Sequence, residues 1–234
     1  MNILNQLTDV LPDSPSALVF NACSALGITI SASEAALRCL TPEFPAFCGE
    51  AVTIKLDCSA EEGDDSSFLY YEMLELIAKS SRPMAAVIES VSQPLSHAAA
   101  GDGMAKAMLA AGTAALVSNG AVRDLGGIRQ AGLMTFAGGL VPGHRHLRWS
   151  GLCDPVHIGG MHIHTGDLLH GDADGLIVIP PQCFSRIIPA CRLVRDFETA
   201  AHAELRRTDR TAAEKQASVQ KLSEQLVASV KALT

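Results

Sequence analysis

Two acidic residues and an arginine stand at a spacing that could support chemistry. Asp102 follows Gly101 at the start of an alanine-rich stretch, and Arg123-Asp124 follows after twenty intervening residues that include an apolar run. This order predicts a helix that starts at Asp102 and stops at Gly112, then a strand and a turn. The acid and the Arg-Asp pair would then meet at one edge of a sheet. Carboxylates and a guanidinium placed there could hold a divalent cation and an oxygen-rich anion.

Each of these residues also has an ordinary structural interpretation. Asp102 could cap the N-terminus of its helix, which contributes about 1 kcal/mol without any catalysis. Arg123 and Asp124 could be a solvated pair of charges. The combination of the spacing, the neighbouring glycines and the order of helix and strand favours a functional site over these separate explanations.

The composition indicates a globular protein with an aliphatic core. The 234 residues are 48% hydrophobic but only 4% aromatic, and the length suits one large domain or two small ones. The net charge of -7 and the pI near 5.6 disfavour a nucleic-acid partner, because phosphate binding needs a basic face. Small anions stay possible, because a local arginine or a metal can outweigh the net charge.

The cysteines and the hydropathy pattern favour the cytoplasm. The chain contains seven cysteines without a CxxC pair, which predicts reduced and mostly buried thiols. The first residues lack the basic and apolar regions of a signal peptide. The longest uncharged stretch, 107–122, is interrupted by Gly112, Asn119 and Gly120, so it predicts a helix and a strand instead of a membrane span.

The apolar periodicity predicts a mixed α/β chain. Helices are expected over 14–40 with a short break, over 68–79, and throughout the chain after Cys183. Strands are expected over 49–57, 85–89, 114–117, 132–137, 156–164 and 176–179. Residues 61–65 are expected to form an acidic loop. The predicted domain organisation is a core over 1–182 and a C-terminal helical extension over 183–234.

Glycine and aspartate motifs between Gly101 and Pro180 resemble one protein family. The residues that carry the resemblance are Gly101-Asp102, Gly120-x-x-Arg123-Asp124, Gly159-Gly160 with Gly166-Asp167-Leu168, and Gly171-Asp172-x-Asp174-Gly175 with the strand that ends at Pro180. The family contains the class II pyruvate aldolases that act on 4-hydroxy-4-methyl-2-oxoglutarate, and the regulators of ribonuclease E activity. The resemblance implies a three-layer sheet-sheet-helix domain of the swivelling-domain type, assembled as homotrimers or homohexamers.

The resemblance also implies roles for the charged residues. Asp124 resembles the direct ligand of Mg²⁺ (or Mn²⁺), and Asp102 resembles the acid that holds the water shell of the metal. Arg123 resembles the group that binds the 2-oxo oxygen of the substrate.

The resemblance also implies roles for the first residues of the helix that starts at Asp102, and for Glu198. Gly103 and Met104 occupy positions whose backbone N–H groups bind the substrate carboxylate in the family. This agrees with physical expectation, since the first N–H groups of a helix have no internal partner and attract anions. Glu198 resembles a catalytic acid that enters the site from a neighbouring protomer.

The expected mechanism follows from these residue types. Cleavage of the C3–C4 bond of a 4-hydroxy-2-oxo acid leaves a pyruvate enolate, whose oxygen needs positive charge that is already in place. The metal and Arg123 would supply it. The 4-hydroxyl must lose a proton, and a metal-bound water oriented by Asp102, Asp124 or Glu198 is the expected base. Oxaloacetate decarboxylation passes through the same enolate and is expected as a side activity. A lysine Schiff base is the competing route, but no lysine has a recognisable context for it.

The sequence is also compatible with two further interpretations. His144-x-His146 and His162-x-His164 could contribute to a zinc site, although no further Cys or His spacing completes one, so surface or rim histidines are expected. A non-enzymatic regulator that binds an RNA-degradation enzyme is the alternative function. The acidic pair around a divalent-metal site favours the enzyme over the regulator. The predicted protein is a cytoplasmic, metal-dependent lyase that takes a small 2-oxo acid and forms a homo-oligomer, with neither nucleic acid nor membrane as partner.

Overall fold

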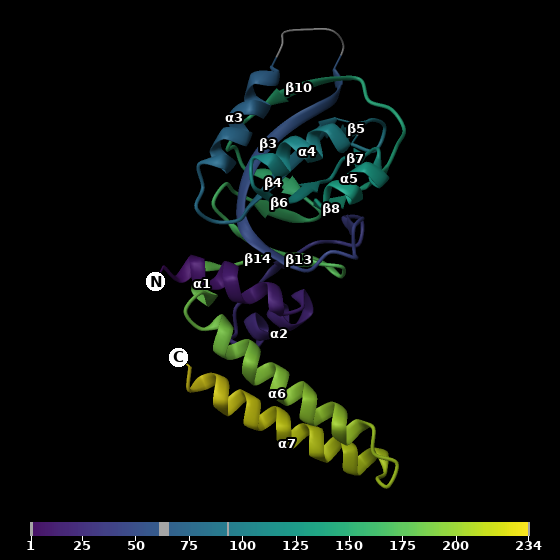
Figure 1. The fold of residues 1–234 in the computed structure, drawn as a ribbon. Coiled ribbons are helices and arrows are strands. Elements are labelled where there is room, and N and C mark those ends of the chain that lie inside the picture. Colours follow the sequence, from purple (N-terminus) through teal and green to yellow (C-terminus); the bar gives the residue numbers. More distant parts are fainter. Residues whose placement is uncertain (1, 61–65, 93, 234) are drawn as a thin grey trace. The chain divides into compact units, whose positions relative to one another are not determined.

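The computed structural model describes residues 2–60, 66–92 and 94–233 (Figure 1), so the predicted acidic loop over 61–65 lies outside the described residues. The chain forms two compact units. The first contains Met1–Ser16 and Ser31–Ile179, and the second contains Ala17–Ile30 and Pro180–Thr234. The predicted division into a core over 1–182 and an extension over 183–234 stays a prediction; the second compact unit combines the C-terminal residues with a segment near the N-terminus.

The first unit is built on a mixed β-sheet that has nine strands within the described residues, in the order β1-β14-β13-β3-β4-β6-β8-β2 with β10 paired to β3. The strands are β1 Ser31–Ala32, β2 Arg38–Cys39, β3 Phe47–Ala60, β4 Met84–Ser92, β6 Thr113–Ser118, β8 Met134–Ala137, β10 His146–Ser150, β13 Leu168–Asp172 and β14 Gly175–Ile179. The central strands β3, β4, β6 and β8 are parallel. Strands β6 and β8 are buried almost throughout, as is typical of parallel strands covered on both faces.

The two faces of this sheet belong to different parts of the core. Along β4, Ala86 and Ile88 pack in one cluster, and Ala85 and Val87 pack in the other. This alternation is the period of a strand. The first cluster includes residues of the helices α3 (Ser67–Ala78) and α4 (Asp102–Ala110). The second includes the hairpin of β11 (Val156–Ile158) and β12 (Met161–Ile163).

A small parallel sheet connects the core to the region of the charged motif. It has the order β5-β7-β9, with β5 at Ala98–Ala100, β7 at Ala121–Val122 and β9 at Gly139–Leu140. The remaining helical elements of this unit are α1 (Ile3–Val10), η1 (Leu11–Asp13) and α5 (Leu125–Ala131). The layers of sheets and helices give the mixed α/β fold of the expected sheet-sheet-helix class, with helices at the C-terminus.

The second unit is helical. It contains most of α2 (Ser16–Ala25), the short η2 (Pro181–Cys183) and two long helices, α6 (Ile187–Leu205) and α7 (Ala212–Lys231). Helices α6 and α7 lie side by side as an antiparallel hairpin (Figure 1). Helix α7 starts at a capping box in which Thr211 and Glu214 bond to each other's backbone N–H groups. Within the described residues, no helix combines the length and apolarity that a membrane span requires.

One expected helix is wrong. The sequence predicted a second helix before residue 40, but β1 and β2 occupy that segment as edge strands of the main sheet. Ser31 pairs with Val178 in β14, and Cys39 pairs with Phe136 in β8. The helical pattern was short and weak, so pairing with distant strands outweighed the local preference.

Candidate active site

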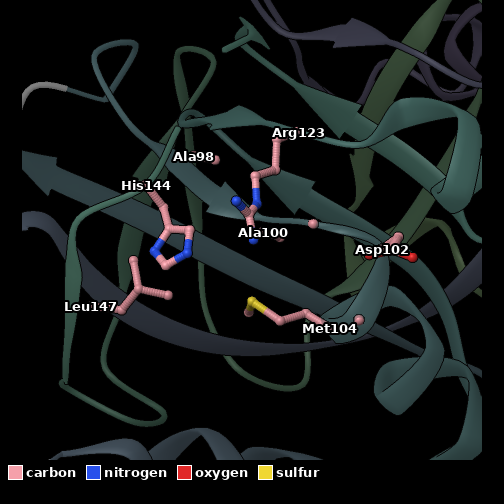
Figure 2. A pocket seen from close by; sticks show the side chains of 9 residues that line it. Ala98, Ala100, Asp102, Met104, Arg123, His144 and Leu147 are labelled. Carbon is pink, nitrogen blue, oxygen red and sulfur yellow. The ribbon is translucent and has the colours of Figure 1, made fainter. Parts of the chain in front are cut away.

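A cavity of about 390 Å³ joins the start of α4 to the residue that follows β7 (Figure 2). Its walls contain Ala98, Ala100, Gly101, Asp102, Gly103, Met104, Arg123, His144 and Leu147. Asp102, Gly103, Met104 and Arg123, which the sequence singled out, therefore line one cavity. Asp124 directly follows Arg123 in the chain.

The small sheet is what brings these residues together. Strands β5 and β7 are parallel, so their carboxyl ends lie at the same edge. The Arg123 N–H donates to the carbonyl oxygen of Ala100 at 3.0 Å, directly before Gly101. A Cβ atom at Gly101 would lie 3.1 Å from Cγ of Arg123 and 3.3 Å from Oδ2 of Asp124. A side chain at position 101 would therefore crowd the side chains of Arg123 and Asp124, which would have to shift slightly to make room.

The Arg123 side chain is half-buried and extends into the cavity (Figure 2). Its Nε lies 3.3 Å from Oδ2 of Asp124. Asp124 has a left-handed backbone with φ of 56° and stands directly before α5, but its side chain makes no capping hydrogen bond to the helix. The left-handed conformation costs on the order of 1 kcal/mol for a residue with a Cβ. The Asp124 carboxylate thus does not cap α5, and it remains half-exposed beside Arg123.

Asp102 is the first residue of α4, and not its N-cap as the ordinary interpretation had it; Gly101 holds that position. Its carboxylate accepts a hydrogen bond from Nζ of Lys106 at 2.6 Å. This hydrogen bond and the charge of Lys106 lower the pKa of Asp102, and the Gly103 N–H and Arg123 act in the same direction. Asp102 is therefore an ionised, hard oxygen donor at neutral pH.

Asp102 and the main chain of Asp124 both contact the first turn of α5. A Cβ at Gly127 would lie 2.6 Å from Cβ of Asp102, so the Asp102 side chain packs directly against this turn. The Gly127 N–H in turn donates to the carbonyl oxygen of Asp124 at 2.9 Å. Mg²⁺ is usually held by one or two carboxylates, with water and substrate oxygens as its other ligands. Asp124 and Asp102 fit that donor set. No group of three or more His, Cys, Asp or Glu ligands occurs in the described part of the chain, so water and substrate would have to complete the coordination.

The start of α4 provides an anion-binding feature. Residues Gly103 and Met104 are in the first turn, where backbone N–H groups lack partners within the helix and the helix dipole favours negative charge. The position of Met104 is supported from behind, because the Tyr70 hydroxyl donates to its carbonyl oxygen at 3.3 Å. A carboxylate bound here would lie within the same cavity as Arg123.

Glu198 belongs to α6 in the second unit, whereas the cavity belongs to the first. Its Oε1 accepts a hydrogen bond from Nδ2 of Asn21 at 3.0 Å, and both residues are in the second unit. Its entry into a neighbouring protomer's site stays a prediction.

Besides Ala98 and Ala100 of β5, the sequence motif missed two further cavity residues, His144 and Leu147. The sequence pattern indicates His144 only as one half of a possible zinc pair with His146, but of these two histidines it is His144 that lines the cavity. His144 and Leu147 both come from the segment between β9 and the middle of β10, which has no periodic pattern. The only sequence signal for His144 is the His144-x-His146 spacing, which is typical of a metal site and does not indicate a cavity wall.

The neighbouring glycines of α5 allow a test of how Asp102 is positioned. Gly127→Ala should displace the Asp102 side chain, because the added Cβ would meet Asp102 at 2.6 Å, and such a displacement should lower the turnover of the reaction proposed below up to about a hundredfold. Gly126→Ala is the matched control, because a Cβ there meets nothing within 4 Å. Steady-state rates of both variants show whether the position of Asp102 affects turnover, and thermal unfolding checks the fold. Equal rates would mean that the position of Asp102 is unimportant.

Comparisons with known proteins agree with this fold. A family model described as RraA-like, Aldolase/RraA, matches residues 16–178. An uncharacterized protein from Pseudomonas syringae pv. tomato has a TM-score of 0.71 and 20% identity, covering 90% of this chain and 92% of that chain. RraAS2 of Streptomyces coelicolor, an unusual member of the RNase ES inhibitor RraA family, has a TM-score of 0.69 and 22% identity over 85% of this chain and 97% of that chain.

The RNA-processing inhibitor RraA from Thermus thermophilis has a TM-score of 0.53 and 17% identity, covering 69% of this chain and 92% of that chain. At these identities the likenesses show the fold alone. No curated protein matches the sequence. The family model spans more than half of the chain. This protein therefore belongs to the RraA-like family, which includes both aldolases and RNase E inhibitors.

Proposed function

We propose that this protein is a divalent-metal-dependent lyase that cleaves 4-hydroxy-2-oxo acids, of the 4-hydroxy-4-methyl-2-oxoglutarate type, to pyruvate. Decarboxylation of oxaloacetate would be a side activity. The observation that supports the proposal is the cavity that joins the N-terminus of α4 to Arg123, with two carboxylates beside it. The proposed cellular location is the cytoplasm.

The cavity suits a 2-oxo acid. The substrate carboxylate would bind the N–H groups of Gly103 and Met104, where the helix dipole favours an anion. Arg123 would donate to the adjacent 2-oxo oxygen, and the apolar walls formed by Ala98 and Ala100 would limit the access of water. The cavity volume of about 390 Å³ lies within the range of small-molecule sites.

Both reactions then follow from the same stabilised charge. When the C3–C4 bond breaks, its electron pair moves towards the 2-oxo oxygen and forms the enolate of pyruvate. Arg123, which lines the cavity, would stabilise that charge from its existing position and so limit reorganisation during the reaction. The metal, held by Asp124 with Asp102 orienting its water shell, would act as a Lewis acid at this end of the substrate.

The proposed function is tested by pyruvate release from 4-hydroxy-4-methyl-2-oxoglutarate and from oxaloacetate, with purified protein, with and without added Mg²⁺. Metal-dependent pyruvate formation from both substrates is the expected result. Metal-independent cleavage, or no release from either substrate, would reject the assignment.

A regulator of an RNA-degradation enzyme is the second candidate, since two of the similar solved structures are described as RraA proteins that inhibit RNA processing or an RNase. These likenesses concern the fold, whereas the lyase proposal gives the acidic pair and Arg123 a direct chemical role in the cavity. Inhibition of purified ribonuclease E by this chain, without any pyruvate release, would favour the regulator.

We also propose that the protein is a homo-oligomer, trimeric or hexameric, in which Glu198 completes a neighbouring site. Mixing inactive Asp124→Asn protomers with inactive Glu198→Gln protomers should then restore some activity, because some interfaces would combine an intact Asp124 with an intact Glu198. Native mass spectrometry would confirm subunit exchange. Exchange without recovered activity would mean that Glu198 acts in its own protomer or outside the site.

A further inference from the structure

His144 lines the cavity but has no role in the proposed mechanism. It is exposed, it lines the cavity together with Leu147, and its ring is directed towards the space around Arg123 (Figure 2). The cavity thus has one unassigned side chain that can both accept and donate a proton.

The segment that carries His144 is fixed to the same two strands that position the site. The Val141 N–H donates to the carbonyl oxygen of Val122 in β7 at 3.1 Å. The Ala98 N–H in β5 donates to the carbonyl oxygen of Gly143 at 2.9 Å. Because β7 leads into Arg123 and β5 leads into Asp102, main-chain hydrogen bonds set the position of His144 relative to both.

The hydrogen bond of the ring determines which nitrogen can act as a base. Nδ1 of His144 lies 2.8 Å from the carbonyl oxygen of Arg145. A carbonyl oxygen only accepts, so Nδ1 must carry the proton in this bond. In the neutral ring Nε2 then holds the free lone pair, and the bond to Arg145 fixes the orientation of the ring.

The direction of the bound substrate determines which atom His144 would meet. In Figure 2, His144 and Leu147 lie on one side of the Arg123 side chain, and Asp102 and Met104 lie on the other. With the substrate carboxylate at the start of α4 and the 2-oxo oxygen at Arg123, the chain from C3 to C4 continues towards His144. The 4-hydroxyl is the group with a proton to lose at that end.

We propose that Nε2 of His144 is the general base that takes the proton of the 4-hydroxyl during cleavage, an inference that rests on the proposed lyase function. The O–H bond breaks as its proton moves to Nε2, the C4–O bond becomes a carbonyl, and the C3–C4 electron pair forms the pyruvate enolate. The imidazolium then returns this proton to C3, which gives pyruvate and the free imidazole. The step needs no oxidant or further reactant, and general-base catalysis of this kind contributes typically about 10²–10⁴-fold.

Oxaloacetate provides the discriminating substrate, because it loses CO₂ and has no 4-hydroxyl proton to remove. The ratio of the cleavage rate of 4-hydroxy-4-methyl-2-oxoglutarate to the decarboxylation rate of oxaloacetate should therefore fall about a hundredfold in His144→Ala. His144→Gln should show the same fall, since it keeps the polarity and much of the volume but has no basic nitrogen. His146→Gln is the matched control: it is also an exposed histidine of the same segment, but it does not line the cavity.

The outcomes separate this inference from the function on which it rests. A wild-type protein that releases pyruvate from neither substrate would overturn both. A wild-type protein with both activities, and an unchanged ratio in the His144 variants, would overturn the role of His144 alone and leave a water molecule as the base. Equal losses of both rates would make His144 a structural part of the cavity wall. Circular dichroism of both variants checks the fold, and because His144 is exposed, neither substitution removes a buried contact.

Discussion

Arg123→Ala should lower kcat by about a hundredfold or more while the fold stays intact. Loss of one preorganised charge contact to a developing oxyanion costs about 3 kcal/mol in the transition state. Arg123 is the arginine that lines the cavity, and its contact with Asp124 is too exposed to contribute much to stability. Arg123→Lys should recover only part of the rate, because the ammonium group lacks the planar fork of the guanidinium.

The measurement is kcat for both proposed substrates, together with the thermal unfolding midpoint. Arg129→Ala provides the control, since Arg129 is an exposed arginine of the adjacent helix that pairs with Glu43, outside the cavity. The control should keep its kcat. A near wild-type kcat in Arg123→Ala would make Arg123 a structural residue and would remove the main support for the enolate mechanism.

The elements around the motif were predictable because they are long or strongly patterned. Strand β6 is a buried apolar run, and α4 is an alanine-rich stretch that ends before a glycine, so the order from Asp102 to Asp124 follows from ordinary helix and strand signals. The strands that bring these ends together were not predictable. β5 and β7 contain three and two residues, which is too short for any periodicity to appear.

Helix α5 was missed for an energetic reason. It contains Gly126 and Gly127, and each glycine disfavours a helix interior by about 1 kcal/mol relative to alanine. The structure explains the second of these glycines, because Asp102 occupies the space that a Cβ at Gly127 would need. The low helix propensity of glycine thus gives the wrong prediction at the place where α5 approaches the site.

His144 illustrates what a motif search leaves out. It is 20 residues beyond Asp124, in an irregular segment whose position depends on hydrogen bonds to β5 and β7. Neither strand was expected from the sequence, so nothing in the pattern could place this histidine opposite Arg123. Sequence reasoning identified the residues of one wall of the cavity and missed the other wall.

Asp124→Asn should abolish metal-dependent activity, and removal of divalent cations with EDTA should do the same to the wild-type protein. An amide has lost the negative charge that a hard cation prefers, while its size is nearly unchanged. The Asp124 carboxylate makes no capping hydrogen bond to α5, so the substitution should leave the start of the helix intact. Isothermal titration with Mg²⁺ measures the effect directly, independently of activity.

The two acids should differ in this titration. Asp102→Asn should weaken Mg²⁺ binding by about 10–100-fold, the usual consequence of removing a group that orients a metal ligand, and Asp124→Asn should weaken it further. Asp154→Asn is the control, because Asp154 is an exposed carboxylate that pairs with Lys55 and does not line the cavity. Equal Mg²⁺ affinity in the wild type, Asp124→Asn and Asp154→Asn would remove Asp124 as a ligand. Full pyruvate release by a chelated, metal-free sample would exclude a class II mechanism, because the enolate would then have to rely on Arg123 and the N-terminus of α4 alone.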